Sequence, residues 1–162
     1  MDGSGQCRWE GVALSSSGGN VARGRQLETG GFPRSEDEPA GPDSILVVDD
    51  DDAMRTAIEI VLAPDYRVTL AFDGVDGYLK ANDLPAPDLI ITDVAMPNLD
   101  GLGMINRIRE SSELRSVPVI FLTGVMSPAL VLRGLSAGAF AYLSKPTSPE
   151  LLRWKVKKTL SH

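Results

Sequence analysis

Asp88-Leu89-Ile90-Ile91-Thr92-Asp93 is the stretch that decides the fold. A short, continuous apolar run that ends in an acid is typical of a strand buried on both faces of a parallel sheet. The same pattern occurs earlier in the chain, in Ile45-Leu46-Val47-Val48-Asp49-Asp50. Two such strands predict an α/β fold in which helices cover both faces of the sheet.

Strand and helix signals alternate five times across the chain after residue 43. Besides the two strands above, the pattern predicts strands at 66–72, 117–122 and 140–143. Helices are predicted at 54–62, 75–82, 102–108 and 128–137, with a last one that ends near residue 160. For the start of this last helix, Thr147 with Glu150 matches a capping box, and Ser148 with Pro149 offers an alternative cap. The alternation predicts a parallel sheet with right-handed crossovers.

The first 42 residues differ in composition from the rest of the chain. They contain nine of the sixteen glycines, a Ser15-Ser16-Ser17-Gly18-Gly19 cluster and the acidic run Glu36-Asp37-Glu38. Such a segment buries too little apolar surface to offset the entropy cost of ordering it. We therefore predict a flexible, disordered Gly/Ser-rich tail over residues 1–42 and one folded domain over residues 43–162.

Bulk composition excludes several classes of protein. The net charge is -6, whereas a surface that binds nucleic acid or anionic lipid carries a basic excess. Cys7 is the single cysteine, so no disulfide can form within the chain. No apolar run approaches the roughly 20 residues of a membrane helix. We expect a cytoplasmic protein that binds neither nucleic acid nor a membrane.

Polar residues follow the predicted strands at the edge of the sheet where ligands bind in such folds. Asp49 and Asp50 follow the first strand, Asp93 the third and Thr123 ends the fourth, while Lys145 follows the fifth. Clustered carboxylates repel one another unless a cation neutralises them, and Mg²⁺ prefers such oxygen ligands. Asp93 could then accept a phosphoryl group as a nucleophile, with the charge of its oxygens compensated by Mg²⁺, Thr123 and Lys145.

Four segments make the sequence similar to the receiver domain of two-component response regulators, over roughly residues 44–160. These segments are Ile45-Leu46-Val47-Val48-Asp49-Asp50, Asp88–Asp93 with Met96-Pro97-Asn98-Leu99-Asp100-Gly101, Pro118–Gly124, and Gly138–Pro146. The resemblance implies a flavodoxin-like, doubly wound (βα)5 fold with a five-stranded parallel sheet in the order 2-1-3-4-5.

The resemblance also implies roles for the residues at the strand ends. Asp93 would be the phosphoacceptor, supplied by a sensor histidine kinase or a histidine phosphotransfer protein. Thr123 and Lys145 would hold the phosphoryl oxygens, and the Lys145–Pro146 bond would be a cis peptide.

Mg²⁺ is the cofactor that the resemblance implies. Its ligands would be Asp49, Asp50 and Asp93, with the backbone carbonyl of Ala95 completing the set.

Tyr142 matches the switch aromatic of these receivers. On phosphorylation Thr123 would move, and the Tyr142 ring would rotate inward and reshape the face formed by the fourth helix, fifth strand and fifth helix. A downstream protein would bind this face, and formation of a homodimer is left open. A half-buried packing aromatic explains the same position equally well.

Two positions depart from the family pattern. Ala95 lies two residues after the acceptor, and Val125 lies two residues after Thr123. Neither side chain can orient a water molecule by hydrogen bonding. We therefore expect slow hydrolysis of the phosphoryl group. The resemblance implies no enzymatic activity beyond the protein's own phosphorylation and dephosphorylation.

Two alternatives remain at this point. A haloacid-dehalogenase-like phosphohydrolase would use Asp49 and Asp51, but Ala53 stands where that family has a threonine or valine. A degenerate receiver would act as a binding module without being phosphorylated. The sequence also leaves open whether the chain is a stand-alone receiver or a fragment of a longer regulator.

Overall fold

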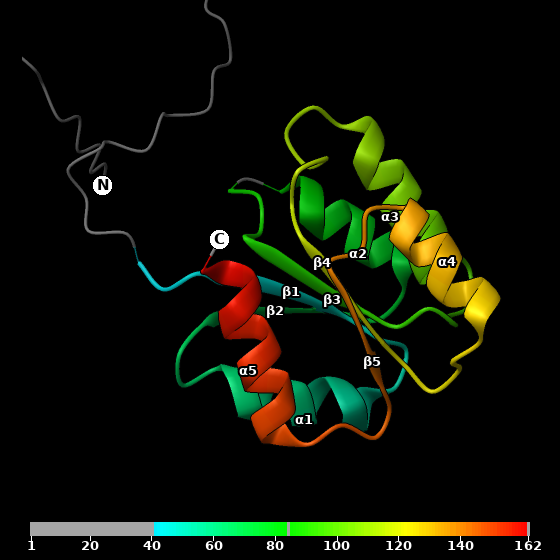
Figure 1. Ribbon diagram of the computed structural model, residues 1–162. Helices are drawn as coiled ribbons and strands as arrows, with labels where there is room; N and C mark the ends of the chain where they lie inside the picture. The colour runs from blue at the N-terminus through cyan, green and yellow to red at the C-terminus, as the bar shows by residue number, and fades with distance from the viewer. Residues whose placement is uncertain (1–40, 84, 162) are drawn as a thin grey trace, which may run out of the picture. The chain divides into compact units, whose positions relative to one another are not determined.

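The computed structural model describes residues 41–83 and 85–161. Within this part of the chain, five strands alternate with five helices (Figure 1). In chain order the elements are β1 Ser44–Val48, α1 Asp52–Leu62, β2 Arg67–Ala71, α2 Gly74–Asn82, β3 Leu89–Thr92, α3 Gly101–Glu110, β4 Val119–Thr123, α4 Pro128–Ser136, β5 Ala141–Ser144 and α5 Pro149–Leu160. The predicted flexible tail lies outside the described residues, apart from its last two positions.

The five strands form one parallel sheet in the order β2-β1-β3-β4-β5. This confirms the predicted flavodoxin-like topology. The register pairs β1 with β3 through Ile45 and Leu89, and β3 with β4 through Ile90 and Val119. Because all pairs are parallel, the carboxyl ends of the strands lie at one edge of the sheet, and the segments that follow them start there.

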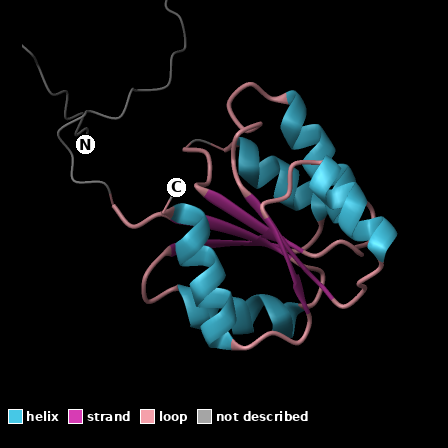
Figure 2. Ribbon diagram, viewed as in Figure 1, coloured by secondary structure: helices cyan, strands magenta, loops and turns pink. Residues whose placement is uncertain are grey.

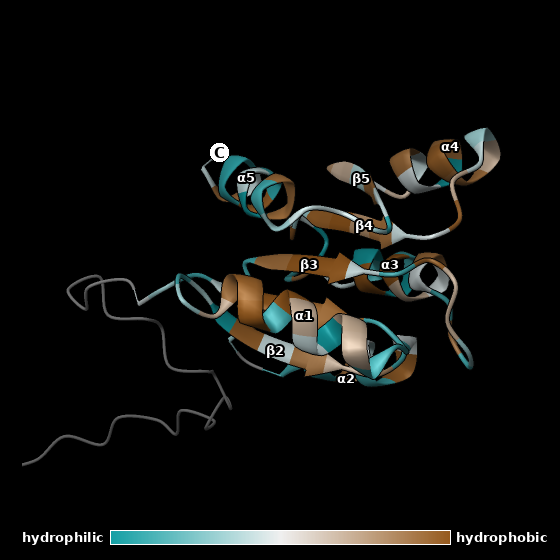
Figure 3. Ribbon diagram, turned by 90° about the horizontal axis from the view of Figure 1, so that it is seen from below, coloured by the Kyte–Doolittle hydropathy of each residue, from teal (hydrophilic) through white to brown (hydrophobic). Residues whose placement is uncertain are grey.

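Helices cover both faces of the sheet, as Figures 1 and 2 show. Side chains of β1 alternate between the two cores: Ile45 and Val47 pack with residues of α1 and α5, while Leu46 and Val48 pack on the side of α2, α3 and α4. The strands therefore contain apolar residues on both faces, and β3 and β4 are coloured as hydrophobic in Figure 3. No helix in the described residues is long and apolar enough to span a membrane.

Each of the five helices begins at a polar side chain that accepts a hydrogen bond from a free backbone N–H of its first turn. These N-cap residues are Asp51, Asp73, Asp100, Ser127 and Ser148. For α5 the structure selects Ser148, followed by Pro149, over the capping box at Thr147. Thr147 Oγ1 is buried, and no hydrogen-bond partner for it is found among the described residues.

The predicted and observed element boundaries differ by one or two residues. The fourth strand was predicted to start at Val117 but begins at Val119, because Pro118 has no N–H to donate to the ladder. The fifth runs from Ala141 to Ser144, one residue later than predicted. Apolar runs reveal a buried strand, but its ends depend on pairing with neighbouring strands.

Candidate functional site

Three residues from distant parts of the sequence meet at the carboxyl edge of the sheet. Asp49 follows β1, Asp93 follows β3 and Lys145 follows β5. Lys145 Nζ donates to Asp49 Oδ2 and to Asp93 Oδ2, at 2.6 Å in each case. Asp49 is 1% exposed and Asp93 is 8% exposed. A single ammonium thus neutralises part of the charge of two buried carboxylates.

Asp49, Asp50 and Asp93 form the candidate metal centre. Each can offer one oxygen such that all three oxygens lie within 4.8 Å of one another. Asp50 is exposed, whereas the other two are buried, so the cluster opens to solvent on one side. A few carboxylate oxygens with room for water molecules are the coordination that Mg²⁺ prefers. The donor set therefore fits the implied ion.

Burial raises the pKa of the Asp49 carboxyl, although hydrogen bonds from Lys145 and from the Asp51 backbone act in the opposite direction. For Lys145, burial acts to lower the pKa, but its hydrogen bonds with Asp49 and Asp93 outweigh burial and raise it. The Lys145 ammonium therefore stays charged. For Asp49, the hydrogen bonds do not fully offset the effect of burial on its carboxylate. A divalent cation near Asp49 would favour its ionised form.

The Asp93 carboxylate is oriented by the chain that follows it. Its Oδ1 accepts hydrogen bonds from Val94 N at 2.5 Å and Ala95 N at 3.2 Å, while Oδ2 accepts from Lys145. Its backbone N–H donates to Val48 O at 2.9 Å. Hydrogen bonds thus fix both carboxylate oxygens and the backbone of Asp93.

Thr123 lies fully buried at the end of β4, the strand next to β3. Its Oγ1 accepts a hydrogen bond from Val125 N at 3.2 Å. Its carbonyl accepts one from Lys145 N at 2.9 Å. The backbone bond ties the end of β4 to the residue that reaches Asp93.

The Tyr142 ring lies between β4 and α4. It stacks on Phe121 with ring centroids 4.9 Å apart, and its hydroxyl donates to Leu130 O at 3.0 Å. Gly134 on α4 makes this placement possible, because a Cβ at that position would overlap the Tyr142 hydroxyl. The half-buried Tyr142 ring therefore occupies space next to α4 that any side chain at position 134 would fill.

A family model for the response regulator receiver domain matches residues 45–157. The chain belongs to this family. Membership favours the receiver over the haloacid-dehalogenase-like alternative, and it agrees with the sheet order described above.

Relatives of this receiver include longer regulators. The transcriptional regulatory protein AfsQ1 of Streptomyces coelicolor is 39% identical over 118 residues, which cover 72% of this chain and 51% of AfsQ1. Response regulator Rre1 of Synechocystis is 35% identical over 126 residues, which cover 75% of this chain and 53% of Rre1. The chain spans about half the length of these curated relatives.

Solved structures similar to this receiver include two single domains. Chemotaxis protein CheY4 of Vibrio cholerae has a TM-score of 0.70 and 31% identity, with 74% of this chain and 100% of that chain covered. The receiver domain of sensor histidine kinase PA1611 from Pseudomonas aeruginosa has a TM-score of 0.69 and 32% identity, with 75% and 100% covered. The latter structure has a magnesium ion coordinated in its active site cleft.

Sequence reasoning assigned no role to several residues that support this receiver site. Arg55 Nη1 donates to the Asp49 carbonyl at 2.5 Å. A Cβ at Gly101 would overlap the carbonyl oxygen of Asp93, so the start of α3 approaches the acceptor backbone directly. Asn98 donates to Asp73. Side chains that hydrogen-bond to backbone atoms follow no periodicity in the sequence. Of these residues, only Gly101, a glycine at the start of a helix, could have indicated a close backbone contact.

Proposed function

We propose that this receiver accepts a phosphoryl group on Asp93 in a Mg²⁺-dependent reaction. The donor is a phosphohistidine on a cytoplasmic sensor kinase or phosphotransfer protein. The observation that carries the proposal is the double hydrogen bond of Lys145 to Asp49 and Asp93 beside a cluster of three carboxylates. A structural ion pair alone would not require the third carboxylate, Asp50, at the solvent side.

In the proposed reaction, a carboxylate oxygen of Asp93 attacks the phosphorus, and the P–N bond to the donor imidazole breaks. The imidazole leaves and takes up a proton. Asp49, Asp50 and Asp93 would hold Mg²⁺ with the Ala95 carbonyl, and the bound ion supplies positive charge beside the phosphoryl oxygens. Lys145 already contacts the Asp93 carboxylate, so its ammonium can neutralise a phosphoryl oxygen without a large movement.

The donor protein must bind to the surface around Asp93. A mainly apolar cleft beside the site could bind an apolar side chain of the donor. The cleft lies between α1 and α5 and has a volume of about 180 Å³. Its lining includes Lys145 together with Met54, Ala57, Val61 and Leu152. We propose that the donor protein packs an apolar side chain into this cleft, which we call the α1–α5 cleft.

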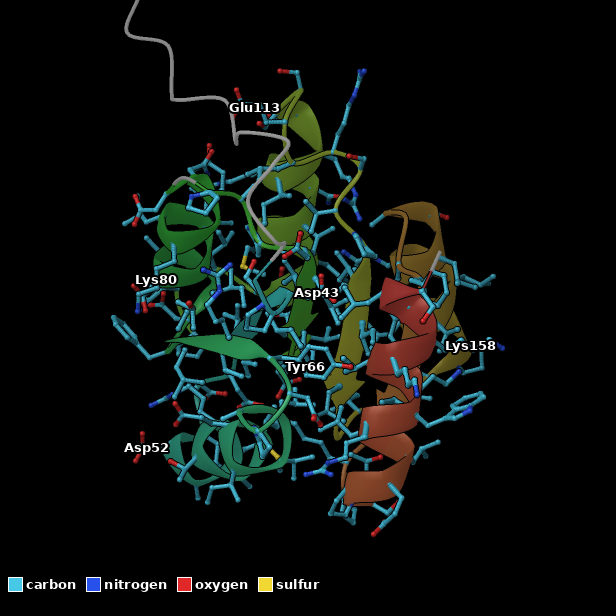
Figure 4. The ribbon with its side chains drawn as sticks, turned by 90° about the vertical axis from the view of Figure 1, so that its left-hand side faces the viewer. Asp43, Asp52, Tyr66, Lys80, Glu113 and Lys158 are labelled. Carbon is cyan, nitrogen blue, oxygen red and sulfur yellow. The ribbon has the colours of Figure 1, made fainter. Side chains whose placement is uncertain are left out.

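A second surface, formed by α4, β5 and α5, is proposed to bind a downstream protein or a second copy of the chain. Leu132 and Leu135 on α4 are 65% and 53% exposed, and Trp154 on α5 is 52% exposed. Lys158, labelled in Figure 4, lies on the side of α5 that faces away from the strands and has its ammonium 5.1 Å from the centre of the Trp154 ring. Tyr142 lies beneath α4, so a movement of its ring would alter this surface.

Labelling with a small radioactive phosphodonor and Mg²⁺ tests the proposal. The wild-type protein should gain an acyl phosphate, and Asp93→Asn should not. Asp65→Asn, a change at an exposed aspartate, is the control and should be labelled like the wild type. Label that persists in Asp93→Asn would refute the assignment. A wild-type protein that takes no label would instead support the degenerate receiver.

A further inference from the structure

The loop between β3 and α3, residues 94–100, contributes backbone groups next to Asp93, the proposed phosphoacceptor. We call it the acceptor loop. It carries the Ala95 carbonyl that is a proposed Mg²⁺ ligand. It also donates the two backbone hydrogen bonds that orient Asp93, from Val94 N and Ala95 N. The position of this loop therefore sets the direction of the acceptor carboxylate and of one metal ligand together.

Asp73, the N-cap residue of α2, is hydrogen-bonded to a side chain of the acceptor loop. Its Oδ2 accepts a hydrogen bond from Asn98 Nδ2 at 2.8 Å, and its Oδ1 accepts one from Asp76 N at 2.8 Å. Asp73 is only 5% exposed. These two bonds hold the pKa of the Asp73 carboxyl below its usual value. The buried carboxylate is thus a fixed, charged acceptor for a loop side chain.

The backbone of the loop is also pressed against α2. A Cβ at Gly74 would overlap the carbonyl oxygen of Leu99, so the first residue of α2 touches the loop directly. Asn98 has a φ of 66°, in the left-handed region that residues other than glycine adopt rarely. A residue in this conformation persists where its surroundings hold it, and here the hydrogen bond to Asp73 does so.

We propose that Asp73, acting through Asn98, is a positioning residue for Mg²⁺ binding. Neither residue contacts the proposed ion; together they fix the loop that presents Ala95 and orients Asp93. The inference rests on the proposed function. Residues that do not contact the metal but orient its direct ligands change the metal affinity.

Two variants remove the link while keeping the local structure. Asn98→Gly tolerates the positive φ and loses only the donor. Asp73→Ser keeps a hydroxyl that can cap α2 but is too short to reach Asn98. In titrations with MgCl₂ followed by backbone amide NMR signals, each variant should raise the dissociation constant about tenfold. The double variant should be no weaker than either single one, because both break the same link.

Asp83→Ser is the matched control. Asp83 lies at the C-terminal end of α2, outside the acceptor loop, and is exposed, and its replacement removes the same charge. It should bind Mg²⁺ like the wild type. Wild-type affinity in Asn98→Gly, or an equal loss in Asp83→Ser, would overturn the proposal.

Failure of the proposed function can be told apart from failure of this inference. If the wild-type protein itself binds no Mg²⁺, the metal site is wrong. Hydrogen exchange at the Ala95 amide, measured without Mg²⁺, then decides whether the link positions the loop. Exchange that is faster in Asn98→Gly than in the wild type supports that part, and unchanged exchange overturns it.

Discussion

Residues around Asp93 would have different parts in the proposed phosphorylation. Lys145 and the backbone of the acceptor loop hold the carboxylate, and these contacts would favour the transfer of a phosphoryl group to it. The rate of hydrolysis depends on other positions, because an attacking water must be oriented next to the phosphorus. Ala95 and Val125 are both exposed at this edge, and neither side chain can hydrogen-bond to such a water.

Replacement of Ala95 by asparagine should shorten the lifetime of the acyl phosphate by about tenfold, since the new amide can hold a water for attack. The decay of labelled protein in the presence of Mg²⁺ measures this lifetime. Ala95→Val, which adds bulk without a polar group, should not shorten it. Equal, fast decay in the wild type and in Ala95→Asn would contradict the hypothesis of a long-lived phosphoryl group.

At the scale of single elements, α4 contains an internal glycine, Gly134, that lowers its helix propensity. A glycine inside a helix costs about 1 kcal/mol relative to alanine, and Gly134 is buried within α4. The cost is offset by the Tyr142 ring, which fits against Gly134, stacks on Phe121 and bonds to Leu130. Helix propensity and ring packing therefore oppose each other at this one position.

Gly134→Ala should lower the free energy of unfolding by about 1 kcal/mol, because the overlap with Tyr142 outweighs the gain in helix propensity. The sign should reverse in a Tyr142→Ala background, where the same change should stabilise the protein by about 1 kcal/mol. Urea unfolding of the four proteins measures both effects. A change of the same sign in both backgrounds would show that the two residues are not coupled.

At the scale of the whole molecule, the two proposed surfaces share α5 but differ at α1 and α4. The α1–α5 cleft lies beside Lys145, while Leu132 and Leu135 are exposed on α4, which packs on the opposite face of the sheet from α1. A donor in the cleft would leave the exposed side of α4 uncovered. The α4 part of the second surface can therefore be tested separately from the cleft.

Ala57→Glu should slow phosphorylation by the donor protein by about tenfold, because it places a charge in the apolar α1–α5 cleft. Phosphorylation by a small phosphodonor should stay unchanged. Ile60→Glu is the matched control, since Ile60 lies on the same helix, is 69% exposed and is not among the residues that line the cleft. Loss of both reactions in Ala57→Glu would indicate damage to the site rather than to docking.

The sequence by itself determined the fold class and the residues at the strand ends, and its resemblance to receiver domains implied the sheet order. Apolar runs such as residues 45–48 and 89–91 are local signals, and the parallel alternation leaves few topologies. Asp49, Asp93 and Lys145 were predictable because every parallel strand delivers its next residue to the same edge. The comparisons support the family, and the roles of these residues stay predictions.

Only the tertiary structure decided which residues support that site. Asp73 and Asn98 lie far apart in the sequence, and their hydrogen bond exists because α2 packs against the acceptor loop. Helix propensity alone gives no reason for Gly134, whereas its contact with the Tyr142 ring does. Such contacts depend on the exact approach of two elements, which local propensity and periodicity do not encode. Burial and the parallel arrangement follow from apolar patterns along the chain, whereas the positioning of side chains depends on contacts between residues that are distant in sequence.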